Sequence, residues 1–209
     1  MFSLMSTHFH SNATHTYTRN KHRHRPSLPS WKQDVVDAMG FGVVNKCVMS
    51  WTNDEDYVWP GDQLWFLLQT PDEDTSGQWT TFSNPSNFKG VPSLTAWIGG
   101  QEAIEAEQKT DDEILETVMN NLKAMFPSIR EPDNVIISRW GQEEHVRGTY
   151  SFPVPGRNFY DDADLLQRRL GRVYFAGEAT GSGWATTMGA WNTGNEAAEA
   201  MIDMLEEEE

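Results

Sequence analysis

The amino-acid sequence predicts a mixed α/β or α+β fold, and three observations support that prediction. Short apolar runs with the composition of β-strands recur along the chain, separated by turn-forming residues. A capped amphipathic helix lies between two of these runs, and a helix rich in small residues follows a glycine-containing turn near the C-terminus. The 209 residues are enough for one domain, or for part of a larger one.

Five apolar runs are predicted to form strands: Val43–Met49, Trp65–Leu68, Leu94–Ile98, Val135–Ile137 and Val173–Ala176. The first run has apolar residues on both faces, which is typical of a strand that is central and buried in its sheet. Residues 71–77 are predicted to form a turn, and residues 148–156 a loop rich in glycine and proline.

Two segments are predicted to be helical. Thr110 followed three residues later by Glu113 fits a capping box, and apolar residues then recur at helical spacing until Pro127 ends the helix. A second helix is predicted from about Met188 to Leu205, and its alanine and glycine residues permit another element to approach closely.

Charge divides the chain into a basic N-terminal segment and an acidic body. Residues 1–25 contain four basic residues, five of the six histidines and no acidic residue, whereas the whole chain carries a net charge of −15. An acidic body disfavours nucleic acid as a direct partner and suits cationic ligands such as polyamines, although solubility alone also explains it. Residues 206–209 form an acidic tail.

Residues 1–25 lack hydrophobic periodicity and are expected to be disordered. Three interpretations stay open: sequence joined upstream of the folded region, an organellar transit segment, and a histidine-based metal tract. The single cysteine, Cys47, suits a reducing compartment, and no apolar run is long enough to span a membrane. We expect a cytoplasmic protein by default, with an organelle as the alternative that the basic segment leaves open.

Lys46 is the first candidate catalytic residue, because a lysine inside an apolar strand is rarely fully buried unless it is paired. Burial can make a lysine chemically useful near neutral pH. The alternative is a lysine at a sheet edge whose stem packs while its ammonium reaches water. The residues alone leave both interpretations open.

The run Arg172–Thr180 is the second candidate site. An apolar stretch ends in Gly177 and Glu178 before a helix, and many α/β proteins present backbone N–H groups to a phosphate-bearing cofactor in this way. Gly177 allows the backbone to approach a ligand, and Glu178 could accept hydrogen bonds from ribose or ribityl hydroxyls. The alternative for Glu178 is a surface glutamate at a turn.

Two tryptophans near predicted loops, Trp140 and Trp184, could hold a cation on their aromatic faces, or they could belong to the core. No nucleophile–His–Asp grouping is found in the sequence. Outside the N-terminal segment there is also no cluster of residues with metal-ligand spacing, so no metal site is predicted.

Four further patterns occur in a fixed order. P-S-L-P-S-W-K at residues 26–32 leads to M-G-F-G-V-V-N-K at residues 39–46, and the strand-like stretch 93–100 precedes Ala103 and Glu107. Arg139-Trp140 then precedes G-T-Y-S at residues 148–151, and F-A-G-E-A-T at residues 175–180 precedes Gly189-Ala190. Together, over about residues 26–205, these patterns resemble the flavin-containing amine oxidases, the family of polyamine oxidases, monoamine oxidases and lysine-specific histone demethylases.

The resemblance implies a fold, a cofactor and a reaction. Residues 26–171 would be the later half of the substrate-binding domain, with a mixed sheet, and residues 172–205 the C-terminal βα unit of an FAD-binding domain. FAD would accept a hydride from the carbon beside an amine nitrogen, and the imine would hydrolyse to an aldehyde while oxygen yields hydrogen peroxide. The small-molecule substrate is expected to be a polyamine.

The resemblance also implies roles for individual residues. Lys46 would be catalytic and hold a water beside the flavin. Cofactor contacts would come from Gly177, Glu178, Thr186, Thr187 and Trp140. Substrate contacts would come from Trp184 and Tyr150.

The sequence departs from the family pattern in several places. Thr149 stands where serine is usual, Met188 stands where histidine is usual, and the loop Gly181–Trp184 is one residue short. The G-x-G-x-x-G motif of the family's first βαβ unit has no counterpart in these 209 residues. We therefore expect a C-terminal fragment, or the product of a truncated gene model, that is inactive alone unless a separate chain supplies the missing half. The alternative is a non-catalytic interaction module.

Overall fold

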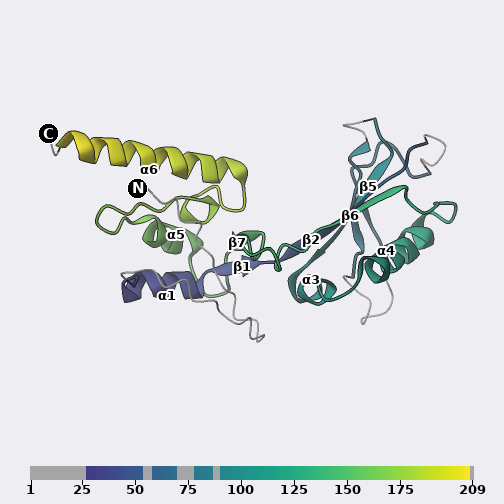
Figure 1. Cartoon of the computed structure of the whole chain (residues 1–209), viewed down its shortest axis with the longest axis horizontal. Coiled ribbons are helices and arrows are strands. Elements are labelled where there is room, and N and C mark those ends of the chain that lie inside the picture. Colours follow the sequence, from purple (N-terminus) through teal and green to yellow (C-terminus); the bar gives the residue numbers. More distant parts are fainter. Residues whose placement is uncertain (1–26, 54–57, 70–77, 87–89, 208–209) are drawn as a thin grey trace. The chain divides into compact units, whose positions relative to one another are not determined.

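The computed structural model describes residues 27–53, 58–69, 78–86 and 90–207. The chain forms two compact units, and Figure 1 labels most of their helices and strands. Unit 2 is the continuous stretch Val43–Gly148, and unit 1 is formed by the residues on either side of it, up to Gly42 and from Thr149. The N-terminal segment 1–25 and the predicted turn at residues 71–77 lie outside the described residues.

Unit 2 is built on a five-stranded antiparallel sheet with the strand order β3-β4-β5-β2-β6. The strands are β2 (Val44–Ser50), β3 (Trp65–Leu67), β4 (Thr81–Ser83), β5 (Ser93–Gly99) and β6 (Asn134–Ile137). Four of the five runs predicted as strands therefore form strands. β2 lies inside the sheet between β5 and β6, and the predicted combination of helices and strands is confirmed.

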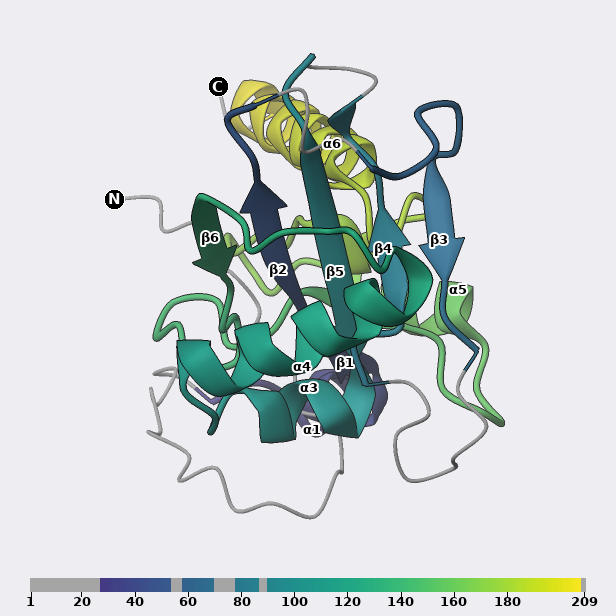
Figure 2. The same ribbon diagram turned by 90° about the vertical axis from the view of Figure 1, so that its right-hand side faces the viewer.

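Two helices cover one face of this sheet, as Figure 2 shows. α3 (Gly100–Ala106) packs against β5 and β2, and α4 (Asp111–Met125) packs against β2. Successive side chains of a strand point to opposite faces, so Cys47 and Met49 of β2 are fully buried while their neighbours are only half-buried. Within unit 2, the described helices α3 and α4 therefore bury one face of β2, and the side chains of the other face are half-buried rather than fully buried as predicted. The core includes Cys47, Met49, Phe82, Leu94, Ala96, Ile98, Ile114, Val118, Met119 and Leu122.

α4 begins at the predicted capping box. The Glu113 N–H donates to the Thr110 hydroxyl oxygen at 3.3 Å, and the Thr110 N–H donates to the Glu113 carboxylate at 2.8 Å. These reciprocal bonds satisfy two of the N–H groups that would otherwise lack a partner at the start of the helix. The local sequence thus fixes where α4 begins.

Unit 1 combines a short two-stranded ribbon with helices from both of its chain segments. β1 (Gly40–Gly42) pairs with β7 (Tyr150–Phe152) in antiparallel register. α1 (Ser30–Ala38) contacts α5 (Phe159–Gln167), and α5 and α6 (Thr187–Glu207) both contact the short 3₁₀ helix η2 (Glu178–Thr180). Its core contains Val35, Met39, Phe159, Ala163, Leu166 and Ala179.

Unit 1 differs from the sequence prediction in three respects. Residues 173–176 form no strand, because the described residues supply no hydrogen-bonded neighbour beyond an isolated bridge between Leu170 and Val173. The predicted loop at residues 148–156 contains β7, which forms because β1 supplies its partner strand. α1 and α5 escape prediction because each is only nine residues long.

Lys32, in α1, is a fully buried lysine that holds the end of α5. Its Nζ donates to the carbonyl oxygens of Leu165, Leu166 and Arg168, and it lies 3.6 Å from the ring centroid of Phe175. The last carbonyl groups of a helix have no partner within the helix, and Lys32 supplies one. Burial lowers the pKa of Lys32 to about 8.

Candidate functional sites in the two units

Lys46 lies on the sheet face of unit 2 that is opposite α3 and α4. The strand register places Trp97 of β5 directly beside it. Lys46 is half-buried, and no carboxylate in the described part of unit 2 forms an ion pair with it. Because β2 is an interior strand, Lys46 does not lie at the edge of the sheet.

Aromatic rings define the surroundings of the Lys46 ammonium. Its Nζ lies 4.2 Å from the centroid of the Trp97 ring, within the range of cation–π attraction. Trp97 Nε1 donates to Ser83 Oγ at 2.8 Å, and the Trp97 ring packs against Trp65 at a centroid distance of 5.7 Å. These contacts fix the indole on which the ammonium rests.

Trp140 follows β6 in a turn that hydrogen bonds hold against β2. Its backbone N–H donates to Oδ1 of Asn45 at 3.0 Å, and Asn45 directly precedes Lys46 in the chain. The side chain of Trp140 is 39% exposed. The structure therefore brings Trp140 and Lys46, two of the predicted site residues, into the same part of unit 2.

Glu178, in unit 1, is the centre of a group of hydrogen bonds. Its carboxylate accepts from the Ser151 N–H at 3.0 Å, from Ser151 Oγ at 2.8 Å and from the Ala185 N–H at 2.7 Å. A carboxylate offers about four acceptor positions, so these three bonds leave room for about one more donor. Glu178 is half-buried and links β7 to the segment that precedes α6.

The segment that Glu178 holds leads into the first turn of α6. Thr186 caps this helix, because its Oγ1 accepts from the Gly189 N–H at 2.9 Å and donates to the Gly183 carbonyl at 2.6 Å. Thr186 and Thr187 are both exposed. The positive end of the α6 dipole therefore lies beside two exposed threonines.

Close backbone packing holds this same segment in place. A Cβ at Gly189 would clash with the carbonyl oxygen of Gly183, and a Cβ at Gly181 would lie 2.5 Å from the methyl group of Thr193. Gly177 has a φ of 142°, which favours glycine, and a Cβ there would meet nothing within 4 Å. Space beside Gly177 is thus open to a ligand, whereas the turn before α6 is filled.

The two residues expected at the substrate, Trp184 and Tyr150, lie in different surroundings within unit 1. Trp184 packs against Phe159 at a centroid distance of 5.4 Å, at the margin of the unit 1 core. Tyr150 is 37% exposed and pairs with Gly42 at the start of β7. Their chain neighbours Ala185 and Ser151 both donate to Glu178, so all three predicted residues belong to one region of unit 1.

Asn45, Glu107 and Trp97 shape the surroundings of Lys46, although the sequence does not predict them as site residues. Asn45 Nδ2 donates to Glu107 Oε1 at 2.8 Å in the interior of unit 2. The signal in the sequence is an asparagine inside an apolar strand, which must find partners if it is buried. Trp97 is brought to Lys46 by the strand register alone, which no local pattern reveals.

Neither a cluster of metal-ligating side chains nor a reactive thiol is found among the described residues. No group of three or more His, Cys, Asp or Glu side chains is arranged there to hold a metal ion. Cys47 is buried, and burial raises the pKa of its thiol to about 12, so the thiol stays protonated. Among the helices that are described, none is long and apolar enough to cross a membrane.

Comparison with known families identifies the class of protein to which these features belong. The chain is a member of the flavin-containing amine oxidoreductases, whose family model, described as "Flavin containing amine oxidoreductase", matches residues 12–202. This confirms the family that the sequence patterns resemble.

Individual relatives fall into two groups, histone demethylases and polyamine oxidases. The chain is 34% identical over 194 residues to histone demethylase-like protein A of Aspergillus fumigatus, covering 86% of this chain and 18% of that protein. It is 33% identical over 168 residues to lysine-specific histone demethylase 1 homolog 1 of Oryza sativa, covering 78% and 19%. It is 32% identical over 178 residues to polyamine oxidase 5 of the same species, covering 83% and 34%. The chain thus spans between 18% and 34% of the length of these three curated relatives.

Proposed function

We propose that this chain provides the catalytic lysine and the flavin-facing turn of an FAD-dependent enzyme that oxidises a polyamine. The observation that carries the proposal is the placement of Lys46, whose ammonium rests on Trp97 in a chain of the flavin amine oxidoreductase family. Within unit 1, Glu178 and the first turn of α6 are the residues that we propose face the flavin.

Lys46 acts through its ammonium group. The Trp97 ring attracts and shields one side of Nζ without accepting a strong hydrogen bond. No carboxylate within the described residues competes for its three N–H donors, so they are free to hold a water molecule or to bind an oxygen atom of a ligand. A water held at Nζ has a fixed position from which it can exchange protons during amine oxidation.

The residues of unit 1 fit the flavin side of FAD. Glu178 has room for one more donor, which matches a single ribityl hydroxyl, and Gly177 leaves open space beside the backbone. Thr186 and Thr187 sit at the positive end of α6, which suits the electron-rich edge of a bound ring. When bound, FAD would accept a hydride from the carbon beside the amine nitrogen and would pass the electrons on to oxygen.

A polyamine substrate agrees with the charge of the chain and with one group of its relatives. The net charge of −15 attracts polycations, and polyamine oxidases of rice and Arabidopsis thaliana are 30 to 32% identical to this chain over 175 to 178 residues. A methylated lysine side chain is the second candidate, because two histone demethylase relatives are 33% and 34% identical. In either case, each unit has an exposed aromatic residue that can attract a cation: Trp140 in unit 2 and Tyr150 in unit 1.

The test is amine-dependent peroxide formation by the full chain with FAD, alone and co-expressed with a protein half that carries a G-x-G-x-x-G unit. Spermine, spermidine, a monoamine and a peptide with dimethylated lysine are compared as substrates. We expect peroxide with the polyamines, and a loss of at least about a hundredfold in Lys46→Met, in line with the usual contribution of acid–base groups. Lys123→Met, which removes an exposed ammonium from α4, is the matched control and should leave the rate unchanged.

Three outcomes would change the proposal. If Lys46→Met retains the wild-type rate, Lys46 has no part in the reaction. Activity with the lysine peptide alone would replace polyamine by methylated lysine as the substrate. If no flavin binds in either preparation, the non-catalytic interaction module is the better description of the chain.

A further inference from the structure

We infer that the buried pair Asn45–Glu107 is a positioning element that sets the places of Lys46 and Trp140 together. The pair lies on the helix-covered side of unit 2, whereas Lys46 projects from the opposite face of the same strand. The inference rests on the proposed function only in taking Lys46 as the catalytic residue.

Asn45 uses both ends of its side-chain amide. Its Nδ2 donates to Glu107 Oε1 at 2.8 Å, while its Oδ1 accepts from the Trp140 N–H at 3.0 Å and from Ser138 Oγ at 3.1 Å. The residue is only 1% exposed, so water cannot replace these partners. A buried amide bonded in this way has one orientation, and it imposes that orientation on the turn that follows β6.

Ser138 carries this restraint to the backbone of Lys46. The Lys46 N–H donates to Ser138 Oγ at 2.8 Å, and the Ser138 N–H donates to the Lys46 carbonyl at 2.9 Å. The regular pairing of β2 with β6 ends at Cys47 and Ile137, so a hydroxyl oxygen takes the place of the next backbone acceptor. The position of Lys46 therefore depends on a hydroxyl that Asn45 orients.

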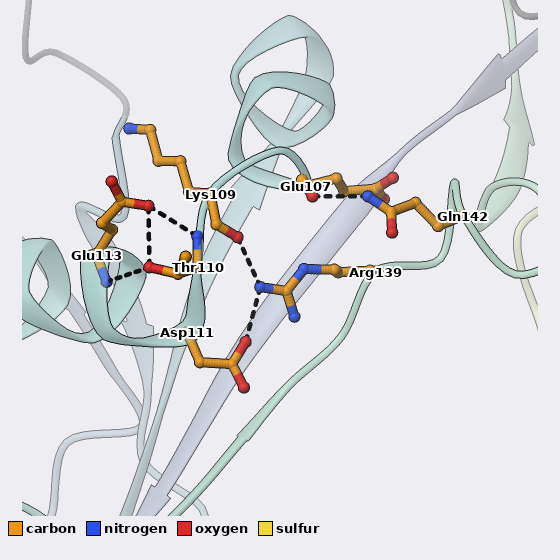
Figure 3. Close-up of polar contacts among 7 residues, drawn as sticks. All are labelled: Glu107, Lys109, Thr110, Asp111, Glu113, Arg139 and Gln142. Carbon is orange, nitrogen blue, oxygen red and sulfur yellow. Dashed lines mark hydrogen bonds and ion pairs between the residues drawn. The ribbon is translucent and has the colours of Figure 1, made fainter.

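Glu107 anchors the pair at the end of α3. Its Oε1 also accepts from the Gly141 N–H at 2.8 Å. Its backbone carbonyl accepts from Gln142 Nε2 at 2.6 Å, as Figure 3 shows. Glu107 is 4% exposed, yet its Oε2 has no hydrogen-bond partner among the described residues. An unbonded oxygen in the interior costs stability, so a role in stability alone does not account for this carboxylate.

Arg139 joins the same turn to the start of α4. Its guanidinium donates to the Lys109 carbonyl at 2.9 Å and pairs with Asp111 at 2.7 Å (Figure 3). Residues 138–142 are therefore fixed to the connection between α3 and α4 on one side and to β2 on the other. A change at Asn45 or Glu107 alters this link without removing any group from the face that carries Lys46.

The test uses the full chain labelled with 5-fluorotryptophan, because Trp97 lies 4.2 Å from Lys46 Nζ and reports on the ammonium. Lys46→Met identifies the shift that Trp97 shows when the ammonium is removed. We expect Asn45→Ala and Glu107→Leu to move or split the fluorine signals of both Trp97 and Trp140. Glu107→Gln keeps the Oε1 acceptor and should restore the wild-type spectrum.

A second variant and a control separate positioning from general loosening of unit 2. Ser138→Ala removes only the hydroxyl that receives the Lys46 N–H, and it should move the Trp97 signal even if the other variants fail to fold. Asn121→Ala removes a different side-chain link, to the carbonyls of Gln78 and Trp79, and should leave both signals in place.

Activity is the second readout in the same set of variants. A displacement of about 1 Å in a catalytic group can cost about a hundredfold in rate, so we expect Asn45→Ala to lower kcat by roughly tenfold to a hundredfold with little change in KM. Unchanged fluorine signals in folded Asn45→Ala and Ser138→Ala would overturn the inference. A Lys46→Met variant with wild-type turnover would instead overturn the proposed function and leave the fluorine result standing.

Discussion

A single ammonium group, that of Lys32, links two segments of unit 1 that are far apart in the sequence. It serves three carbonyl groups at the end of α5, and the ring of Phe175 packs against it. In the sequence, Lys32 is noticed only as the last residue of the P-S-L-P-S-W-K pattern. Nothing in its local sequence indicates that its hydrogen-bond partners lie 133 to 136 residues away. The stability of unit 1 should therefore respond to the charge and to the loss of this one side chain.

We predict that Lys32→Met lowers the free energy of unfolding by ~1–3 kcal/mol at pH 7, because buried carbonyl groups lose their donor. The effect should also depend on pH. The pKa of Lys32 falls from its usual value of 10.5 to about 8 on folding. As the pH rises from about 8 to 10.5, the folded state has lost the Lys32 proton while the unfolded state still holds it, so the free energy of unfolding of the wild type increases over this range. Below about pH 8 that gain is lost. Urea unfolding from pH 7 to 10 should show the gain in the wild type but not in Lys32→Met.

The exposed-lysine variant Lys109→Met provides the comparison for this series, because it removes an ammonium without uncovering buried carbonyls. Its unfolding free energy should follow the wild-type curve at every pH. A constant difference between wild type and Lys32→Met across the whole range would contradict the assignment of a lowered pKa to Lys32.

At the scale of single elements, the capping box of α4 is a local device whose effect can be measured. We predict that Thr110→Ala lowers stability by ~1 kcal/mol at pH 7, because the first turn loses its side-chain acceptor. Hydrogen bonds from Thr110 lower the pKa of Glu113 from its usual 4.5. The stabilisation by these bonds is therefore fully present above pH 4.5, and it is lost as the pH falls through the lowered pKa of Glu113. Urea unfolding at pH 7 and pH 3 should show a smaller difference at pH 3, whereas Thr117→Ala within the helix should show no such change.

Two glycines of α6 form a matched pair for testing the turn before this helix. A Cβ at Gly189 would clash with the backbone of Gly183, whereas a Cβ at Gly194 would meet nothing within 4 Å. We predict that Gly189→Ala destabilises unit 1, and that Gly194→Ala stabilises α6 by ~0.5–1 kcal/mol. Thermal unfolding of both variants is the measurement, and equal effects in the two would contradict the packing described for this turn.

Elements defined by local patterns could be predicted, and elements defined by distant partners could not. An apolar run in the sequence predicts β2, and a capping box followed by apolar residues at helical spacing predicts α4. β1 and β7 are three residues each and exist only because they pair with one another. Val173–Ala176 has the composition of a strand but finds no neighbouring strand within the described residues, so it forms no ladder beyond an isolated bridge at Val173.

The same distinction applies to the candidate sites. Lys46 and Glu178 are unusual in their local sequence, and both were predicted as site residues on that ground. The partners of Glu178 come from β7 and from the turn before α6, and the Asn45–Glu107 bond joins residues 62 positions apart. The sequence indicates that a polar residue such as Asn45 needs partners, but it does not indicate which distant residues supply them.

At the scale of the whole chain, the two units differ in how the sequence builds them. Unit 2 is one continuous stretch with its own sheet, helices and core, whereas unit 1 needs both chain segments. We predict that residues 43–148 fold when expressed alone, with cooperative thermal unfolding and the same Trp97 fluorine signal as the full chain.

The complementary prediction concerns unit 1. Residues 149–209 alone should not give cooperative unfolding, because α1, β1 and the Lys32 ammonium are then missing. Cooperative folding of that piece, or failure of residues 43–148 to fold, would contradict the division into units.

The insertion of unit 2 within the sequence of unit 1 has a consequence for synthesis on the ribosome. Translation adds ~5–20 residues per second, and Lys32 is made 133 residues before the first of its carbonyl partners. On the nascent chain, α1 therefore waits on the order of ten seconds for α5, whereas the described strands and helices of unit 2 all lie within residues 43–148 and are made before α5. Among the described elements, α1 is thus the first to be synthesised, and we expect it to stay accessible to chaperones and proteases until α5 has been made.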